Sequence, residues 1–284
     1  MNLRKKAPAW VQRRGRAAGQ WWGERTASKR PLPDFLVIGG QRCGTTSLFR
    51  ALMAHEQIRR PIMHKGVNYF DLNYFRGEDW YRGHFPVREG GEATNTRVFD
   101  SSGYYMWHPM AAQRIARDLP GVKIIAMVRD PVERAYSAYK HELARGFEWE
   151  KDFGRALDLE DARLAGEIER LVADPRYYSF NHRHHAYRHR GEYAALLAPF
   201  IDGLGRDQVH IVQSEAFFAE PEDEFLQITK FLEIEPKLPE RFDRYNARPG
   251  AGLSAEVRER LATHYAPHDD ALADLLGQTP RWRQ

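Results

Sequence analysis

Cysteine is nearly absent from this sequence, since its 284 residues contain only Cys43. A single cysteine excludes an internal disulfide framework and a metal site built from several cysteines. No apolar run approaches the roughly 18–20 residues needed to cross a bilayer. The basic N-terminus also lacks the apolar stretch of a secretory signal. We therefore expect a cytoplasmic protein.

Excess positive charge is confined to the N-terminus. The net charge is +4, but residues 1–30 hold nine basic residues and one acidic residue, so the rest of the chain is net negative by four charges. A net acidic body argues against a nucleic-acid partner. The basic tail carries Trp10, Trp21 and Trp22, a combination that suits peripheral contact with anionic lipid headgroups. The alternative is a loose extension whose tryptophans pack back onto the domain.

The sequence does contain enough apolar residues for a substantial core, with 42% hydrophobic residues. Apolar runs at residues 34–38, 123–128 and 209–212 predict buried strands. Helical spacing predicts helices at residues 45–55, after Pro131, and at 222–232 and 255–264. Strands that alternate with helices predict an α/β domain with a mostly parallel central sheet flanked by helices. We divide the chain into a tail, residues 1–30, and a domain, residues 31–284.

The segment between the first predicted strand and helix has the spacing of a phosphate-binding loop. Gly39 and Gly44 stand as in a Walker A loop, where backbone N–H groups and a helix N-terminus hold phosphate. Thr45 occupies the position of the Walker lysine, and a cation stands inside the loop instead, at Arg42. The missing lysine argues against a nucleoside triphosphate as the substrate. The alternative is a glycine turn followed by a capped helix.

A second anion site is predicted where the strand at residues 123–128 ends. Arg129 follows this strand, and open α/β sheets bind ligands at the carboxyl ends of their strands. Asp130 and Pro131 are suited to begin a helix. Ser137 lies about two turns into that helix and could join Arg129 on one phosphate. The alternative is a buried Arg129 paired with Asp130 or Glu133.

Together these residues resemble the sulfotransferases that use 3′-phosphoadenosine 5′-phosphosulfate (PAPS), in particular the glycosaminoglycan type. Residues 40–47 are similar to the family's 5′-phosphosulfate loop, usually written with Lys where this chain has Arg42. Residues 128–131 and 136–137 are similar to its 3′-phosphate motif, and residues 79–86 and 91–94 are weaker similarities. The resemblance implies a P-loop-type three-layer fold and transfer of a sulfuryl group from PAPS to a hydroxyl or amine.

The resemblance also implies which residues bind PAPS, and it implies no metal cofactor. The PAPS-binding residues would be Arg42, Cys43, Gly44, Thr45, Thr46, Ser47, Arg129 and Ser137. The acceptor could be a small molecule, a carbohydrate or a lipid, and neither the acceptor nor the oligomeric state can be read from the sequence. Two rival interpretations are a P-loop kinase or NTPase that uses ATP and Mg²⁺, and a non-catalytic protein that binds nucleotide at a membrane surface.

One departure from the family concerns the catalytic base. Family members often carry Lys-Glu where this chain has Lys65-Gly66, and that glutamate takes the proton of the acceptor. Arg42 and Lys65 remain as catalytic candidates. Glu92 is our first substitute for the base and His64 the second, because a neutral imidazole suits base work near pH 7. Asp71 is a third candidate, and transfer without a base to an easily ionised acceptor is the remaining possibility.

Other clusters permit several interpretations. A histidine group could bind metal, face an anion or acceptor, or begin a solvated helix; its members are His182, His184, His185 and His189. Residues 246–250 could form a late loop that contacts PAPS. An aromatic group is expected to fill the core, and its members are Trp80, Tyr81, Tyr104, Tyr105 and Trp107. Cys43 is expected to be a small buried filler.

Overall fold

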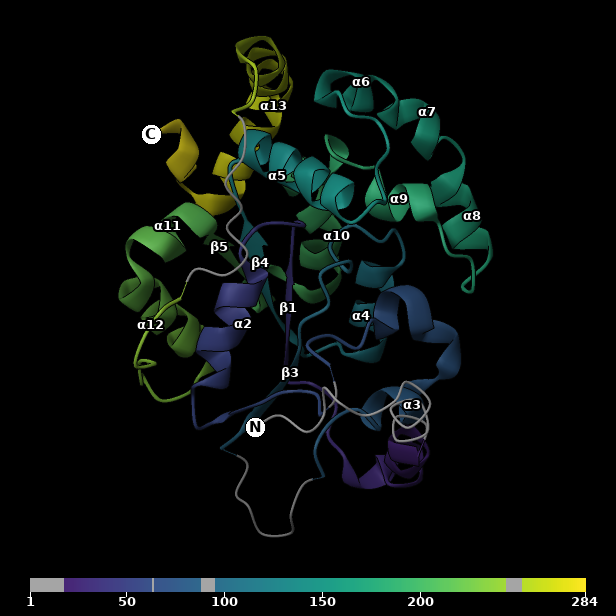
Figure 1. The fold of residues 1–284 in the computed structure, drawn as a ribbon. Coiled ribbons are helices and arrows are strands. Elements are labelled where there is room, and N and C mark those ends of the chain that lie inside the picture. The colour runs from purple at the N-terminus through teal and green to yellow at the C-terminus, as the bar shows by residue number, and fades with distance from the viewer. Residues whose placement is uncertain (1–17, 63, 88–94, 244–251) are drawn as a thin grey trace, which may run out of the picture.

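The computed structural model describes residues 18–62, 64–87, 95–243 and 252–284, and these form a layered α/β domain (Figure 1). The described strands make one sheet in the order β2-β3-β1-β4-β5, and every pair is parallel. They are β1 Phe35–Gly39, β2 Ile58–Arg59, β3 Arg97–Asp100, β4 Lys123–Val128 and β5 Val209–Gln213. The predicted α/β class with a parallel sheet is confirmed.

Two of the apolar runs predicted as strands lie at the centre of the sheet. All five residues of β1 are buried, and β1 pairs with β4 from Phe35 opposite Lys123 to Gly39 opposite Met127. The chain leaves β1 towards β2 on one side and returns through β3 before it crosses to β4 on the other side. The carboxyl ends of β1, β3 and β4 therefore meet at a topological switch point, where such sheets bind ligands.

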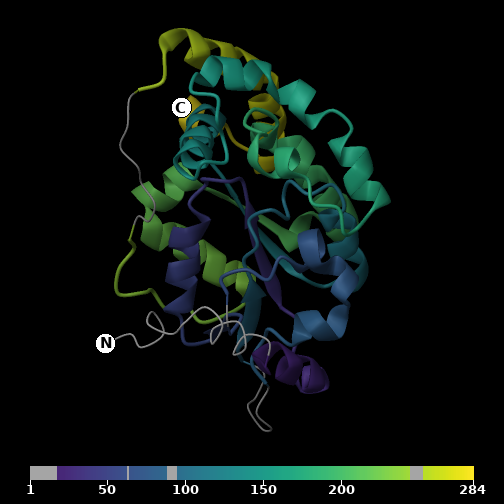
Figure 2. The same cartoon turned by 45° about the vertical axis from the view of Figure 1, so that its right-hand side comes forward.

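Helices cover both faces of this sheet, as two views of the fold show (Figures 1 and 2). One face carries α2 (Thr45–Met53) and α12 (Pro221–Leu232), and the other carries α4 (Ala111–Asp118) and α10 (Tyr193–Leu204). All four of these helices contribute apolar side chains to the main core. Because helices cover both faces, the strands are almost wholly apolar.

A second group of helices lies over the carboxyl ends of the strands, at the top of Figure 1. It consists of α5 (Pro131–Ala144), α6 (Phe153–Asp158), α7 (Glu160–Leu164), α8 (Glu167–Ala173), α9 (Phe180–His184) and α13 (Ala255–Leu276). A separate apolar cluster joins α5, α6 and α13 through Tyr139, Phe153, Tyr187 and Tyr265. This cluster fixes α5, which carries Ser137, against the rest of the cap.

Short elements complete the described fold. They are α3 (Glu78–Arg82), α11 (Ser214–Ala219), the 3₁₀ turns η2 (Ala27–Lys29), η4 (Tyr74–Arg76), η5 (His189–Gly191), η6 (Arg206–Gln208) and η7 (Arg281–Arg283), and one π-helical segment, η3 (Tyr69–Asn73). None of the helices in the described ranges is long and apolar enough to span a membrane.

The described part of the tail packs on the domain through glycine and not through tryptophan. Residues 18–25 are helical, and Gly23 lies so close to Gly83 that a Cβ on Gly23 would be 2.4 Å from the Gly83 carbonyl oxygen. Trp21 and Trp22 remain 56% and 58% exposed. The alternative in which the tryptophans pack back onto the domain is therefore wrong for Trp21 and Trp22, and Trp10 lies outside the described residues.

Candidate functional site

The loop between β1 and α2 has a backbone shaped for close approach to an anion. Gly44 adopts a left-handed conformation (φ 82°) and begins α2 with no side chain capping the helix. A Cβ on Gly39 would lie 2.6 Å from the carbonyl oxygen of Met127, so this position must be glycine in the present backbone. The uncapped end of α2 presents N–H groups and partial positive charge.

Lys65 brings a second cation to this loop from a distant segment. Its Nζ donates to Thr45 Oγ1 and Thr46 Oγ1, both at 3.2 Å. Burial lowers the pKa of Lys65 to about 8. Lys65 thus places an ammonium group beside the position that a Walker lysine would fill from inside the loop.

Arg42, Ser137 and Arg129 meet on the other side of the loop. Arg42 Nε donates to Ser137 Oγ at 3.0 Å, and Arg129 Nη1 donates to the carbonyl oxygen of Arg42 at 3.2 Å. Arg42 reaches Ser137 because its own backbone is left-handed (φ 76°), an uncommon conformation for a side chain of this size. The loop after β1 and the helix after β4 therefore share one cationic corner.

Arg129 makes no ion pair with Asp130 or Glu133 in the described structure. Asp130 instead caps α5, accepting from the backbone N–H groups of Val132 at 2.9 Å and Glu133 at 3.4 Å. Glu133 pairs with Arg258. The alternative in which Arg129 is a structural ion-pair partner of either residue is therefore wrong, and its guanidinium can serve an external anion.

Buried residues from distant segments form hydrogen bonds with this corner. Tyr193 Oη donates to the carbonyl oxygen of Arg129 at 2.8 Å, and Ser214 Oγ donates to that of Cys43 at 2.6 Å. Arg190 Nη1 donates to Gln41 Oε1 at 3.2 Å. Burial raises the pKa of Cys43 to about 11, so this thiol is a packed filler, as predicted. The family resemblance points only loosely to the segment from Tyr187 to Tyr193, and local spacing does not reveal these contacts because the partners lie far from the loop along the chain.

The candidates for the base are placed very differently. His64 is exposed and Asp71 is buried in η3, where burial raises the pKa of its carboxyl to about 7. Glu92 lies outside the described residues. A Cβ on Gly66 would lie 2.4 Å from the carbonyl oxygen of Ser101. The site where the family carries glutamate is thus filled here by the backbone that follows β3.

Three members of the histidine group lie inside the protein, whereas the His189 side chain remains 32% exposed. His182, His184 and His185 are buried. Tyr104 Oη lies 2.6 Å from His182 Nδ1, and His184 Nδ1 lies 2.9 Å from Glu142 Oε2. Burial lowers the pKa of His182. The prediction of a solvated helix start is wrong, because these rings replace water with protein partners. The predicted core role of the aromatic group is confirmed by the burial of Trp80, Tyr81, Tyr104 and Tyr105.

A pocket of about 490 Å³ adjoins the loop on the outer side of α2. Its wall begins at Ser47 and continues along α2 to Ala54, and its opposite side is formed by Phe217 and residues 237–243. Most of its lining is polar or charged, and the apolar part is formed by alanines of α2, Leu238, Pro239 and two phenylalanines, Phe217 and Phe242.

These features define a nucleotide-binding α/β protein of the P-loop type that lacks the Walker lysine and has a second cationic site. The sequence also matches the sulfotransferase domain over residues 32–248. This match covers well over half of the chain, so the protein belongs to the sulfotransferase family. The reaction of that family is transfer of a sulfuryl group from PAPS, its co-substrate, to a hydroxyl or amine.

Several known proteins are similar to this chain. The bifunctional heparan sulfate N-deacetylase/N-sulfotransferase of Drosophila melanogaster is 28% identical over 88% of this chain and 27% of its own length. Human bifunctional heparan sulfate N-deacetylase/N-sulfotransferase 3 is 39% identical over 43% of this chain and 14% of its own length. This chain therefore corresponds to a minor part of these relatives. The crystal structure of a sulfotransferase from Alicyclobacillus acidocaldarius is 28% identical, with a TM-score of 0.68 over 89% of this chain and 100% of that one.

Proposed function

We propose that this protein transfers a sulfuryl group from PAPS to a hydroxyl or amine of a carbohydrate or small-molecule acceptor and releases adenosine 3′,5′-bisphosphate. The observation that carries the proposal is the meeting of two cationic groups at one loop. Lys65 contacts Thr45 and Thr46 on one side, and Arg42 contacts Ser137 on the other. Two such sites on one loop suit a nucleotide with anionic groups at two separate positions.

Each residue then has a defined role. The backbone from Gly44 and the hydroxyls of Thr45, Thr46 and Ser47 hold the 5′-phosphosulfate, beside Lys65. Arg129 and Ser137 hold the 3′-phosphate, and Arg42 lies between the two groups. Cys43 contributes its backbone and fills space beneath the loop.

Sulfuryl transfer is compatible with a loop that has no Walker lysine. The sulfuryl group carries less charge than a terminal phosphate, so its transfer needs less neutralisation than phosphoryl transfer. Lys65 and Arg42 would stabilise charge on the departing 5′-phosphate. Positioning of the acceptor in line with the sulfur would supply most of the remaining rate.

Gly66 has no side chain that could accept the proton of the acceptor, so another group must take it. His64 and Glu92 are the proposed bases, since His64 is exposed beside Lys65 and the family places residues near Glu92 close to the acceptor. Glu92→Gln or His64→Ala should abolish turnover while binding of adenosine 3′,5′-bisphosphate survives. Unchanged turnover in both variants would point to transfer without a protein base, to an acceptor that ionises easily.

A carbohydrate is the acceptor class that the relatives favour, because several of them are named for heparan sulfate. An amine or hydroxyl on a sugar would meet the reactive end of PAPS near Lys65. The direct test is transfer of labelled sulfate from PAPS to a panel of amino sugars and simple phenols. Failure with every acceptor would favour a non-catalytic nucleotide-binding protein.

Calorimetry with three nucleotides tests the binding site itself. We expect adenosine 3′,5′-bisphosphate to bind more tightly than ADP or ATP. Arg129→Ala should weaken bisphosphate binding by about 10–100-fold, the loss of one charged hydrogen bond, and leave ADP binding nearly unchanged. Arg145→Ala, at the exposed end of the same helix, is the matched control and should bind like the native protein. Tighter binding of ATP than of the bisphosphate would support a kinase or NTPase instead.

A further inference from the structure

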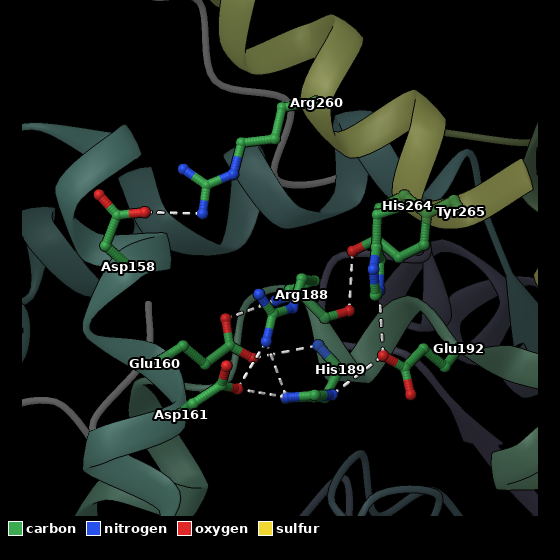
Figure 3. A network of polar contacts seen from close by, with 9 residues as sticks. All are labelled: Asp158, Glu160, Asp161, Arg188, His189, Glu192, Arg260, His264 and Tyr265. Atoms are coloured by element: carbon green, nitrogen blue, oxygen red, sulfur yellow. Dashed lines mark hydrogen bonds and ion pairs between the residues drawn. The ribbon is translucent and has the colours of Figure 1, made fainter.

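One group of side chains near α13 has no role in the proposed reaction. Within the described residues, Glu192, His264 and His268 bring three potential metal-ligand atoms within 4.8 Å of one another. Glu192 precedes α10, and the two histidines lie on α13, four residues apart. Figure 3 shows His264 above Glu192, with both side chains directed into the same gap between the elements.

The spacing of the histidines places both imidazoles on one face of the helix. Residues four apart in an α-helix are neighbours on its surface, and the ring centroids of His264 and His268 are 5.1 Å apart. His264 Nε2 already lies 3.1 Å from Glu192 Oε1. A carboxylate therefore faces the pair directly.

Packing holds this arrangement in place. Tyr265, the residue next to His264, is 1% exposed, and its hydroxyl donates to the carbonyl oxygen of Arg188 at 2.7 Å. This contact fixes the rotation of α13 relative to η5. Glu192 is held from the other side by His189 Nδ1, 2.9 Å from its Oε1. Both histidine contacts use Oε1, and no contact of Oε2 is seen in the described residues.

The ligand types suit a transition metal. Two imidazole nitrogens and one carboxylate oxygen form a common zinc set, with metal–ligand distances of about 2.0–2.2 Å. Ligand atoms in such a site lie about 3–3.5 Å apart, so small side-chain rotations would close the present group. The nearby acidic and basic groups, Glu160, Asp161, Arg188 and His189, largely balance one another in charge.

We propose that Glu192, His264 and His268 bind one divalent transition metal ion, with Zn²⁺ as the best-matched candidate and water as a fourth ligand. The ion would clip α13 to the start of α10. This proposal departs from the sequence-based expectation of a protein without metal, which did not consider this group because residues 192 and 264 are far apart in the chain.

The clip would also stiffen the PAPS site if the proposed function holds. Tyr193 follows Glu192 directly, and its hydroxyl supports the carbonyl oxygen of Arg129 at 2.8 Å. A metal that fixes this segment should therefore increase affinity for adenosine 3′,5′-bisphosphate. By linkage, the bisphosphate should increase affinity for the metal by the same factor.

The test is titration of the untagged full chain with Zn²⁺ and, separately, Co²⁺. We expect one ion per chain, a higher melting temperature with Zn²⁺, and visible absorption typical of tetrahedral Co²⁺. His268→Asn and Glu192→Gln should each weaken binding by about 100-fold. The control Glu259→Gln, which removes one exposed carboxylate from α13, should bind metal like the native protein.

Two results would overturn the metal site. One is the absence of stoichiometric binding at micromolar metal, and the other is binding that His268→Asn leaves intact. Calorimetry with adenosine 3′,5′-bisphosphate in chelator-treated protein separates this inference from the proposed function. If nucleotide binding is normal and metal binding is absent, only the metal site is wrong.

Discussion

At the scale of single residues, the partly buried ammonium group of Lys65 is expected to lower the stability of the fold and to increase the rate of sulfuryl transfer. Burial lowers its pKa to about 8, so its charged form is held in the folded protein at a cost. We expect Lys65→Met to raise the free energy of unfolding of the nucleotide-free protein at pH 7 by about 1–3 kcal/mol. The same change should reduce sulfuryl transfer at least about 100-fold, because the ammonium group beside Thr45 is lost. Chemical denaturation and turnover measurements check both effects.

The same lysine predicts a specific pH dependence. Between pH 8 and its ordinary pKa of 10.5, the unfolded chain binds this proton and the folded chain does not, so stability rises with pH in that window. The stability advantage of Lys65→Met should therefore be largest below pH 8 and should shrink towards pH 10.5. Nucleotide binding should weaken above pH 8 in the native protein alone. A constant difference in stability between the two proteins across this range would contradict the assignment.

We predict that placing the family's glutamate at position 66 will not supply a catalytic base. A Cβ at this position would lie 2.4 Å from the Ser101 carbonyl oxygen, so Gly66→Ala should destabilise the protein by about 1–3 kcal/mol. Gly66→Glu should lose stability and gain no activity. Gly103→Ala, where nothing lies within 4 Å, is the matched control. Thermal melts of these variants decide the matter, and a fully stable Gly66→Ala would show that the chain after β3 can move aside.

The candidate site residues that the sequence suggested and the structure brings together belong to short contiguous motifs. The loop around Gly44 and the segment from Arg129 to Ser137 could be read from local spacing. Tyr193 and Ser214 could not, because their contacts with Arg129 and Cys43 join segments that only the tertiary fold brings together. The sequence also could not show why residue 66 is glycine, because the close backbone at Ser101 is brought there only by the tertiary fold.

At the scale of elements, the N-cap of α5, Asp130, contributes both to stability and to the position of the proposed 3′-phosphate site. The Asp130 side chain accepts from two backbone N–H groups, and loss of such a cap costs about 1 kcal/mol. We expect Asp130→Ala to lower stability by about that amount and also to weaken binding of adenosine 3′,5′-bisphosphate, because Arg129 and Ser137 flank the cap. Asp152→Ala, which uncaps α6, should cost similar stability but leave binding intact. Equal binding by both variants would argue against α5 as the 3′-phosphate element.

The elements also show where sequence patterns fall short. Residues 123–128 were predicted at the bounds of β4, because six consecutive residues with an apolar majority suit a strand buried on both faces. β2 has two residues and β3 includes Arg97 and Asp100, so neither carries a recognisable pattern. The last predicted helix was expected to end at His264, yet α13 continues past Pro267 to Leu276, since Leu272 remains buried against the core.

At the scale of the whole molecule, the net charge of the chain does not indicate the charge of its proposed ligand. The body is net acidic, yet the proposed anion site depends on a few individual cationic groups, among them Arg42, Lys65 and Arg129. Residues 1–17 contain six basic and no acidic residues, so their deletion changes the net charge from +4 to −2. Charges at the surface act mainly within a Debye length of about 8 Å at physiological salt. None of the proposed binding groups lies in residues 1–17.

We therefore expect deletion of residues 1–17 to change affinity for adenosine 3′,5′-bisphosphate by less than about threefold at 150 mM salt, within the range of screened long-range electrostatics. Binding to vesicles that contain anionic lipid should fall sharply in the same variant, if the basic residues and Trp10 attach the protein to such surfaces. Calorimetry and vesicle co-sedimentation measure the two effects separately. A tenfold loss of nucleotide affinity would mean that the tail takes part in the site, and the division between residues 1–30 and residues 31–284 would then not separate attachment from catalysis.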